Sequence, residues 1–264
     1  MKFKKINTVI LAVIFLINFS GCGTAADNKS VDGGTTADNA GIDSGTTADN
    51  QDISNTDNED IDKGETMLLY QGHASLRLTS KDGTVIYIDP AVGDGYDLPA
   101  DIILVTHEHS DHNQVNLITQ KEDCVVIRVS DAILNGEHNT FTIKGIEIEA
   151  VEAYNSNHSK NTSVGFLILI DGIMIYVAGD TSKTEQMETL SERHIDYAFL
   201  PCDGVYNMNA EDAAEYAKLI GAKNNIPYHT RNMNDLFSSD VAERFDAPNK
   251  LIIEPGEEII LSRY

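Results

Sequence analysis

The sequence predicts an α/β protein built as a four-layer sandwich, in which two β-sheets pack face to face with helices outside them. Three observations support this prediction. Segments of strand and helix character follow one another in the order β-rich, helix, β-rich, helix. Two strand segments, 85–89 and 102–106, are almost entirely apolar until their last residue, as buried strands are. The chain of 264 residues is 41% hydrophobic, which is enough for a sizeable core.

The elements are expected in the following order. Short apolar runs predict strands over residues 67–70, 75–78, 85–89, 102–106, 124–129, 146–151, 164–170, 173–178, 197–200, 225–228, 251–253 and 259–261. Ser182 and Glu185 predict a capping box at the start of one helix. Asn209 predicts the N-cap of a second helix, whose alanine-rich face ends at Gly221.

Residues 1–21 have the pattern of a secretory signal peptide. Three lysines in the first five residues precede an apolar stretch, Thr8–Phe19, which is shorter than the roughly 20 residues that span a bilayer. The sequence Phe19-Ser20-Gly21-Cys22 resembles a bacterial lipobox, which implies that Cys22 is lipidated. The alternative is an uncleaved N-terminal anchor with an incidental cysteine. Under either interpretation, the rest of the chain is expected outside the cytoplasm at a membrane surface.

Residues 22–66 are predicted to be a disordered, acidic tether. They contain an 11-residue repeat: GTAADNKSVDG (23–33), GTTADNAGIDS (34–44) and GTTADNQDISN (45–55). Without aromatic residues, such a segment buries too little apolar surface to offset the entropy of ordering it. A repeated Ca²⁺ motif is the alternative, but the D-x-D-x-D-G spacing of calcium loops is missing. Residues 67–264 then form one predicted domain.

The chain is strongly acidic, with 19 Lys and Arg against 42 Asp and Glu and a net charge of −23. A nucleic acid or an anionic lipid surface would be repelled by this charge. We therefore expect a small-molecule substrate, no nucleic-acid partner, and contact with the membrane through the N-terminal lipid alone.

The strongest chemical signal is His107-x-His109-x-Asp111-His112, directly after an apolar strand. Imidazole and carboxylate donors suit Zn²⁺, Mn²⁺ or Fe²⁺. On an extended strand end, His107 and His109 point to the same side and can hold one ion. If a helix follows, Asp111 and His112 are carried past that ion and can face a second one.

This motif resembles the signature of the metallo-β-lactamase superfamily, and the resemblance extends over nearly all of residues 67–264. Asp180, His158 and His229 match the family's later motifs, each near the end of a strand. The resemblance implies that His107, His109 and His158 bind one metal ion, that Asp111, His112 and His229 bind a second, and that Asp180 bridges them. It implies two divalent ions, zinc first, with manganese or iron as alternatives, and a water between them that acts as the nucleophile. Asp111 is the expected catalytic group. Asp89 is expected to hold a ligand from behind.

A further resemblance is to the branch that includes bacterial L-ascorbate-6-phosphate lactonase, through Gly72-His73-Ala74-Ser75, Ala178-Gly179-Asp180-Thr181 and the segment 201–213. That enzyme's substrate is not carried over, because an exported lipoprotein rarely meets a cytosolic sugar phosphate. Candidate substrate-binding residues are His73, Tyr154, Asn155 and Tyr206. For His73, a structural hydrogen-bonding role is the equal alternative.

The expected function is hydrolysis of a lactone, amide or phosphoester outside the cytoplasm by a metal-bridged hydroxide. Two alternatives stay open. One is a surface lipoprotein that binds a metal or a small acidic ligand without catalysis, although all seven ligand positions are filled. The other is oxidative chemistry at iron, although the full ligand set, including His112, disfavours a single-ion site. Nothing in the sequence selects β-lactamase activity.

Overall fold

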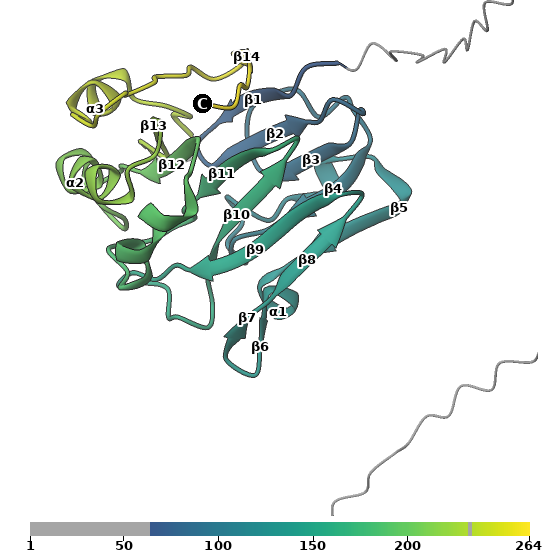
Figure 1. The fold of residues 1–264 in the computed structure, drawn as a ribbon, viewed down its shortest axis with the longest axis horizontal. Coiled ribbons are helices and arrows are strands. Elements are labelled where there is room, and N and C mark those ends of the chain that lie inside the picture. Colours follow the sequence, from purple (N-terminus) through teal and green to yellow (C-terminus); the bar gives the residue numbers. More distant parts are fainter. Residues whose placement is uncertain (1–63, 232–233) are drawn as a thin grey trace, which may run out of the picture. The chain divides into compact units, whose positions relative to one another are not determined.

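The computed structural model of the chain describes residues 64–231 and 234–264, so the predicted signal peptide, Cys22 and nearly all of the tether lie outside the described residues. Two six-stranded sheets lie face to face (Figure 1). The strand orders are β14-β1-β2-β3-β4-β5 and β13-β12-β11-β10-β9-β8, and β6 pairs with β7 in a small ribbon. The predicted α/β sandwich is therefore confirmed.

The strands of the first sheet are β1 (Met67–Gly72), β2 (Ser75–Thr79), β3 (Val85–Ile88), β4 (Ala100–Leu104), β5 (Gln120–Ile127) and β14 (Glu258–Ile260). Those of the second sheet are β8 (Thr140–Ile143), β9 (Ile146–Glu152), β10 (Val164–Ile170), β11 (Ile173–Val177), β12 (Tyr197–Pro201) and β13 (Asn224–Tyr228). The ribbon is β6 (Ile133–Leu134) with β7 (Glu137–His138). The helices are η1 (Val115–Leu117), α1 (Val129–Ala132), η2 (Gln186–Arg193), α2 (Ala210–Ile220) and α3 (Ser239–Arg244), where η marks a 3₁₀ helix.

The main core lies between the two sheets. Leu76 and Ile86 of the first sheet share one buried cluster with Phe166 and Ile168 of the second, and none of these four side chains is exposed. A second cluster packs α2 and η2 against the outer face of the second sheet, at the side where Figure 1 shows α2. The outer face of the first sheet is covered by the loop before β4 and by η1, where Tyr96 stacks on Tyr87. The outer layers are thus unequal in thickness.

Two predicted elements differ from the structure. The capping box does not form, because the Ser182 amide donates to the Tyr154 carbonyl (2.8 Å) and so is not available to Glu185. The helix instead begins at Gln186, as a 3₁₀ helix, with the Thr184 hydroxyl accepting from the Met187 amide (3.3 Å). Residues 251–253 are not a strand; a single bridge joins Asn225 to Lys250, and the apolar run reflects burial between the sheets rather than strand pairing.

Strand direction brings several loops to one edge of the sandwich. β3, β4 and β5 run parallel, as do β11, β12 and β13. β9 has the same direction as β11, because both are antiparallel to β10. The loops that leave the carboxyl ends of these strands carry the predicted ligands. Within the described residues, no helix has the length and apolarity needed to cross a membrane.

Candidate metal centre

The structure brings the seven predicted ligands together from four separate loops. His107, His109, Asp111 and His112 follow β4, His158 follows β9, Asp180 follows β11 and His229 follows β13. Instead of a helix after His109, the segment makes a tight turn, in which the His112 amide donates to the His109 carbonyl (3.0 Å).

The donor atoms fall into two groups, called here the first and the second half-site. The first half-site is His107, His109 and His158; the second is His73, Asp111, His112 and His229. Within each group, one ligand atom per residue lies within 4.8 Å of those of the others. Asp180 joins them, because its carboxylate forms a third such group with His107 and His112. This is the position expected of a bridging carboxylate.

In the first half-site, neutral oxygen atoms hold the Nδ1 edges of the buried imidazoles. The Thr106 hydroxyl donates to Asp89 (2.7 Å) and lies 3.1 Å from His107 Nδ1. Since its proton goes to Asp89, this hydroxyl accepts from His107 Nδ1–H, which leaves Nε2 bare. His158 Nδ1 lies 2.9 Å from the Asn155 side-chain oxygen, and its Nε2 lies 3.1 Å from His109 Nδ1.

In the second half-site, carboxylates hold the Nδ1 edges of two imidazoles. His112 Nδ1 lies 2.9 Å from Asp89 Oδ2, and His229 Nδ1 lies 3.1 Å from Asp203 Oδ2. Asp89 therefore lies behind His112, a predicted ligand, and its role in holding that ligand stays a prediction. A carboxylate behind an imidazole fixes its tautomer and makes its other nitrogen a stronger donor to a metal.

These surroundings shift the pKa values of His107 and His112 in opposite directions, while burial lowers the pKa of His73 in the second half-site. Burial and the neighbouring His112 lower the pKa of His107 to about 2. Burial alone would also lower the pKa of His112, but Asp180 and Asp89 outweigh it and raise this pKa to about 9. Asp180 is held below its usual pKa range by His229 and His112, against the effect of burial. The carboxylate thus stays ionised, as a metal ligand must.

Several buried nitrogen and oxygen atoms that could bind a metal ion lack hydrogen-bond partners. They are Nε2 of His107, His112 and His229, and Oδ1 of Asp180. Buried polar atoms are normally paired, so atoms that face one another unpaired need a common partner. Once the imidazoles have lost their protons, a divalent cation is that partner for their nitrogens and for the carboxylate oxygen. The residues present therefore fit the metal centre that the sequence predicts.

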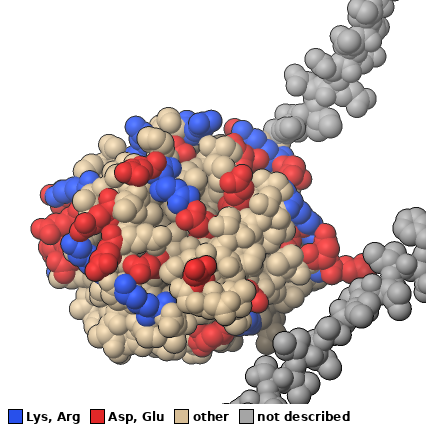
Figure 2. Space-filling model, turned by 60° about the horizontal axis from the view of Figure 1, so that its bottom comes forward, with Lys and Arg blue, Asp and Glu red and all other residues tan. Residues whose placement is uncertain are grey.

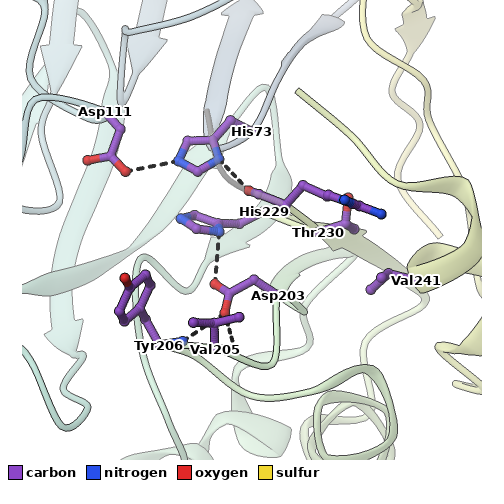
Figure 3. A pocket seen from close by; sticks show the side chains of 9 residues that line it. His73, Asp111, Asp203, Val205, Tyr206, His229, Thr230 and Val241 are labelled. Atoms are coloured by element: carbon purple, nitrogen blue, oxygen red, sulfur yellow. Dashed lines mark hydrogen bonds and ion pairs between the residues drawn. The ribbon is translucent and has the colours of Figure 1, made fainter. Parts of the chain in front are cut away.

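Two cavities open on the centre. One, of about 420 Å³, is lined by His73, Asp111, Asp203, Val205, Tyr206, His229, Thr230, Arg231 and Val241 (Figure 3). The other, of about 470 Å³, is lined by His109, Asp111, Asn157, His158, Asp180, Tyr206 and His229. Both volumes suit a small ligand. Asp111 and Tyr206 line both cavities, and Tyr206 is 58% exposed.

The other candidate substrate-binding residues have different positions. The Lys160 ammonium lies over the Tyr154 ring, 4.7 Å from the ring centroid. The Asn155 side chain holds His158 and also donates to the Asn207 side chain (2.8 Å). A role for either residue in substrate binding stays a prediction. His73 is fully buried in the turn between β1 and β2, and its Nε2 lies 3.3 Å from Asp111 Oδ2.

Sequence reasoning missed Asp203 as a functional residue. Its Oδ1 accepts the backbone amides of Val205 and Tyr206 (2.6 and 2.9 Å), and its Oδ2 faces His229, as the dashed lines in Figure 3 show. Asp203 therefore fixes a predicted metal ligand and the cavity wall together. A carboxylate just past the end of β12 was the available signal, of the same kind as Asp89 after β3.

Three non-glycine residues of the centre have left-handed backbone conformations: His73 (φ 52°), Asp89 (φ 46°) and His229 (φ 45°). Such conformations are costly for side chains with a Cβ and persist only where the surroundings impose them. Here backbone hydrogen bonds do so: the His73 amide donates to Leu236 (2.6 Å) and the His229 amide donates to the His73 carbonyl (2.8 Å). Their joint location at one site points to function.

Two face-to-face mixed sheets with a histidine- and aspartate-rich centre at the strand ends define a metallo-β-lactamase fold with the ligand set of a metal-dependent hydrolase. The model of the beta-lactamase superfamily domain matches residues 67–229. The chain belongs to this superfamily, within the UPF0173 group of metal-dependent hydrolases.

Two UPF0173 metal-dependent hydrolases illustrate the relationship. The one of Nitratidesulfovibrio vulgaris is 30% identical over 75% of this chain and 97% of its own length. The one of Methanospirillum hungatei is 29% identical over 72% of this chain and 97% of its own length. Igni18, a metallo hydrolase of Ignicoccus hospitalis, has the same fold, with a TM-score of 0.61 and 22% identity over 76% of this chain and all of that one. The chain is therefore a metal-dependent hydrolase.

Proposed function

We propose that this chain hydrolyses a small molecule carrying a lactone, amide or phosphoester bond, using two divalent ions, and that it does so outside the cytoplasm. One observation carries the proposal: Nε2 atoms and a carboxylate oxygen from separate loops converge, buried and without hydrogen-bond partners. Zinc is the first candidate, with manganese or iron as alternatives. When bound, such ions supply a water of lowered pKa and polarise the substrate oxygen under attack.

The chain's own residues supply position and proton transfer. Asp111 lines both cavities, so its carboxylate is placed to orient a water and take up its proton. Tyr206 lines both cavities from an exposed loop and offers a phenol to the substrate. Acidic side chains are interspersed with basic ones across the face in Figure 2, which supports a small-molecule substrate rather than a nucleic acid.

The experiment is elemental analysis of the purified full-length chain, followed by a panel of chromogenic lactones, amides and phosphodiesters. We expect two ions per chain and turnover that chelation abolishes and added metal restores. The Asp111→Asn variant should lose turnover, whereas Asp212→Asn, at an exposed position on α2, should keep it. A chain that holds two ions and hydrolyses nothing in the panel would favour the non-catalytic metal- or ligand-binding role.

The location is a separate part of the proposal. It rests on the signal-like residues 1–21 and on Cys22. Labelling of growing cells with an alkyne fatty acid should mark the wild-type chain, and Cys22→Ser should abolish the label. An unlabelled chain in the cytosolic fraction would contradict the extracytoplasmic assignment and leave the proposed chemistry untouched.

A further inference from the structure

His73 has the same arrangement of its two ring nitrogens as the buried imidazoles predicted to bind metal. In His107, His112, His158 and His229, Nδ1 faces an oxygen atom outside the centre. Nε2 lies without a hydrogen-bond partner in His107, His112 and His229, and it faces His109 in His158. In His73, Nδ1 lies 2.8 Å from the Arg231 carbonyl oxygen, and Nε2 lies 3.3 Å from Asp111. Figure 3 shows the His73 ring beside that of His229 and turned toward Asp111.

The hydrogen bond to Arg231 decides the tautomer of His73. A carbonyl oxygen can only accept, so Nδ1 carries the proton and a neutral ring leaves Nε2 bare. An ionised Asp111 also only accepts. Two acceptors therefore face each other across 3.3 Å inside the protein, and this contact needs a cation or an additional proton between them.

The surroundings of His73 are those of the second half-site. Its ring centroid lies 3.8 Å from that of His229 and 5.5 Å from that of His112. Its ligand nitrogen lies within 4.8 Å of one ligand atom from each of Asp111, His112 and His229. The backbone conformation that directs the ring there is left-handed and is held by hydrogen bonds on both its amide and its carbonyl group.

We propose that His73 is an eighth metal ligand of the centre, binding the second ion together with Asp111, His112 and His229. This inference rests on the proposed two-ion centre. The second ion then has four ligand residues besides the shared Asp180, whereas the first has three. A site with this many donors favours ions that accept six ligands over the four-coordinate preference of structural zinc.

The test uses the full-length chain in mild detergent, stripped of metal and titrated with Co²⁺. The visible absorption per Co²⁺ ion rises as its coordination number falls, so it reports on the number of ligands directly. The variant is His73→Gly, because glycine accepts the left-handed backbone and leaves a space that imidazole fits. The matched control is His194→Gly, at an exposed histidine with φ 51° at the end of η2.

If His73 is a ligand, His73→Gly should bind the first Co²⁺ as the wild type does. It should bind the second Co²⁺ at least about 100-fold more weakly, because the loss of a residue that only supports a ligand from outside costs about 100-fold at most. The absorption of the second ion should intensify, and added imidazole should restore both its affinity and its spectrum. His194→Gly should match the wild type. His73→Asn, which also tolerates this backbone, gives a second variant if His73→Gly does not fold.

Two outcomes would overturn the proposal. In one, the variants bind the second Co²⁺ with wild-type affinity and spectrum. In the other, its affinity falls while its spectrum is unchanged and imidazole has no effect, which makes His73 a positioning residue for Asp111. A wild-type chain that binds fewer than two ions would refute the two-ion function itself, so the two failures are distinguishable.

Discussion

The two half-sites use the same side chain, imidazole, in different surroundings. In the first, a hydroxyl oxygen and an amide oxygen hold His107 and His158, and His109 is exposed. In the second, the carboxylates of Asp89 and Asp203 hold His112 and His229. The oxygen behind each ring therefore sets the charge and basicity of its nitrogen, so we expect the two ions to differ in affinity and in pH dependence.

Asp180 contacts residues of both half-sites and so belongs to neither one alone. Its Oδ1 lies 3.4 Å from His112 Nε2 and 3.2 Å from His229 Nε2, and it also groups with His107. The shared position predicts the largest effect. In Asp180→Asn, both ions should bind more weakly by more than roughly 100-fold, beyond the range for an outer partner.

Isothermal titration with Zn²⁺ measures both affinities in Asp180→Asn, with the exposed Asp212→Asn as the control. Loss of one ion alone would show that Asp180 belongs to a single half-site and does not bridge.

Asp203 separates the half-sites, because it contacts His229 and none of the first group. In Asp203→Asn, the Oδ1 bonds to the Val205 and Tyr206 amides can remain, while an amide NH₂ faces His229 Nδ1. We expect the second ion to bind about 10- to 100-fold more weakly and the first ion to be unchanged. The same titration checks this, and an equal loss at both ions would contradict independent half-sites.

The grouping of His107, His109, Asp111 and His112 was predictable, because histidines and an aspartate directly after an apolar strand form a local signal. His158, Asp180 and His229 depended on the resemblance, since nothing local links them. The roles of Asn155 and Asp203 depend on contacts between distant loops: Asn155 meets Asn207, and Asn207 meets Asp203 (2.7 Å). No spacing in one sequence encodes such contacts.

The fold shows the same limit. Its sheets follow from apolar runs, and α2 follows from its Asn209 cap, whose side chain accepts from Asp212 (2.8 Å) as predicted. The capping box at Ser182 failed because a tertiary hydrogen bond to Tyr154 took its amide. Local rules hold where the chain's own neighbours satisfy them and fail where another loop competes.

The pH dependence of metal binding sharpens the comparison. The pKa of His107 is lowered to about 2 and that of His158 is also lowered, so these rings are neutral at pH 7 in metal-free protein. The pKa of His112 is raised to about 9, and that of His229 is raised as well, so protons must leave before an ion binds. Below pH 9, the His112 proton alone should lower second-ion affinity about tenfold per pH unit, and the His229 proton should add to this fall. His73, whose pKa burial lowers, adds no such proton, and first-ion affinity should stay nearly flat.

Titrations at pH 6, 7 and 8 in buffers of different ionisation enthalpy count the protons released with each ion. Proton release with the second ion alone is the expected result. If the same number of protons is released with each ion, the expected electrostatic difference between the half-sites is contradicted.

Asn155 offers the smallest and most selective change in the first half-site. Its side-chain oxygen accepts from the His158 amide (2.9 Å) and meets His158 Nδ1 (2.9 Å). A neutral amide polarises the ring less than a carboxylate does. Asn155→Ala should therefore weaken the binding of the first ion by only about 3- to 10-fold, which corresponds to one net hydrogen bond. Asn161→Ala, at an exposed position in the same loop, is the matched control. If the affinity for the second ion falls equally, the chain of contacts through Asn207 to Asp203 couples the half-sites. The oxygen behind each ring then affects the binding of both ions and not only of its own.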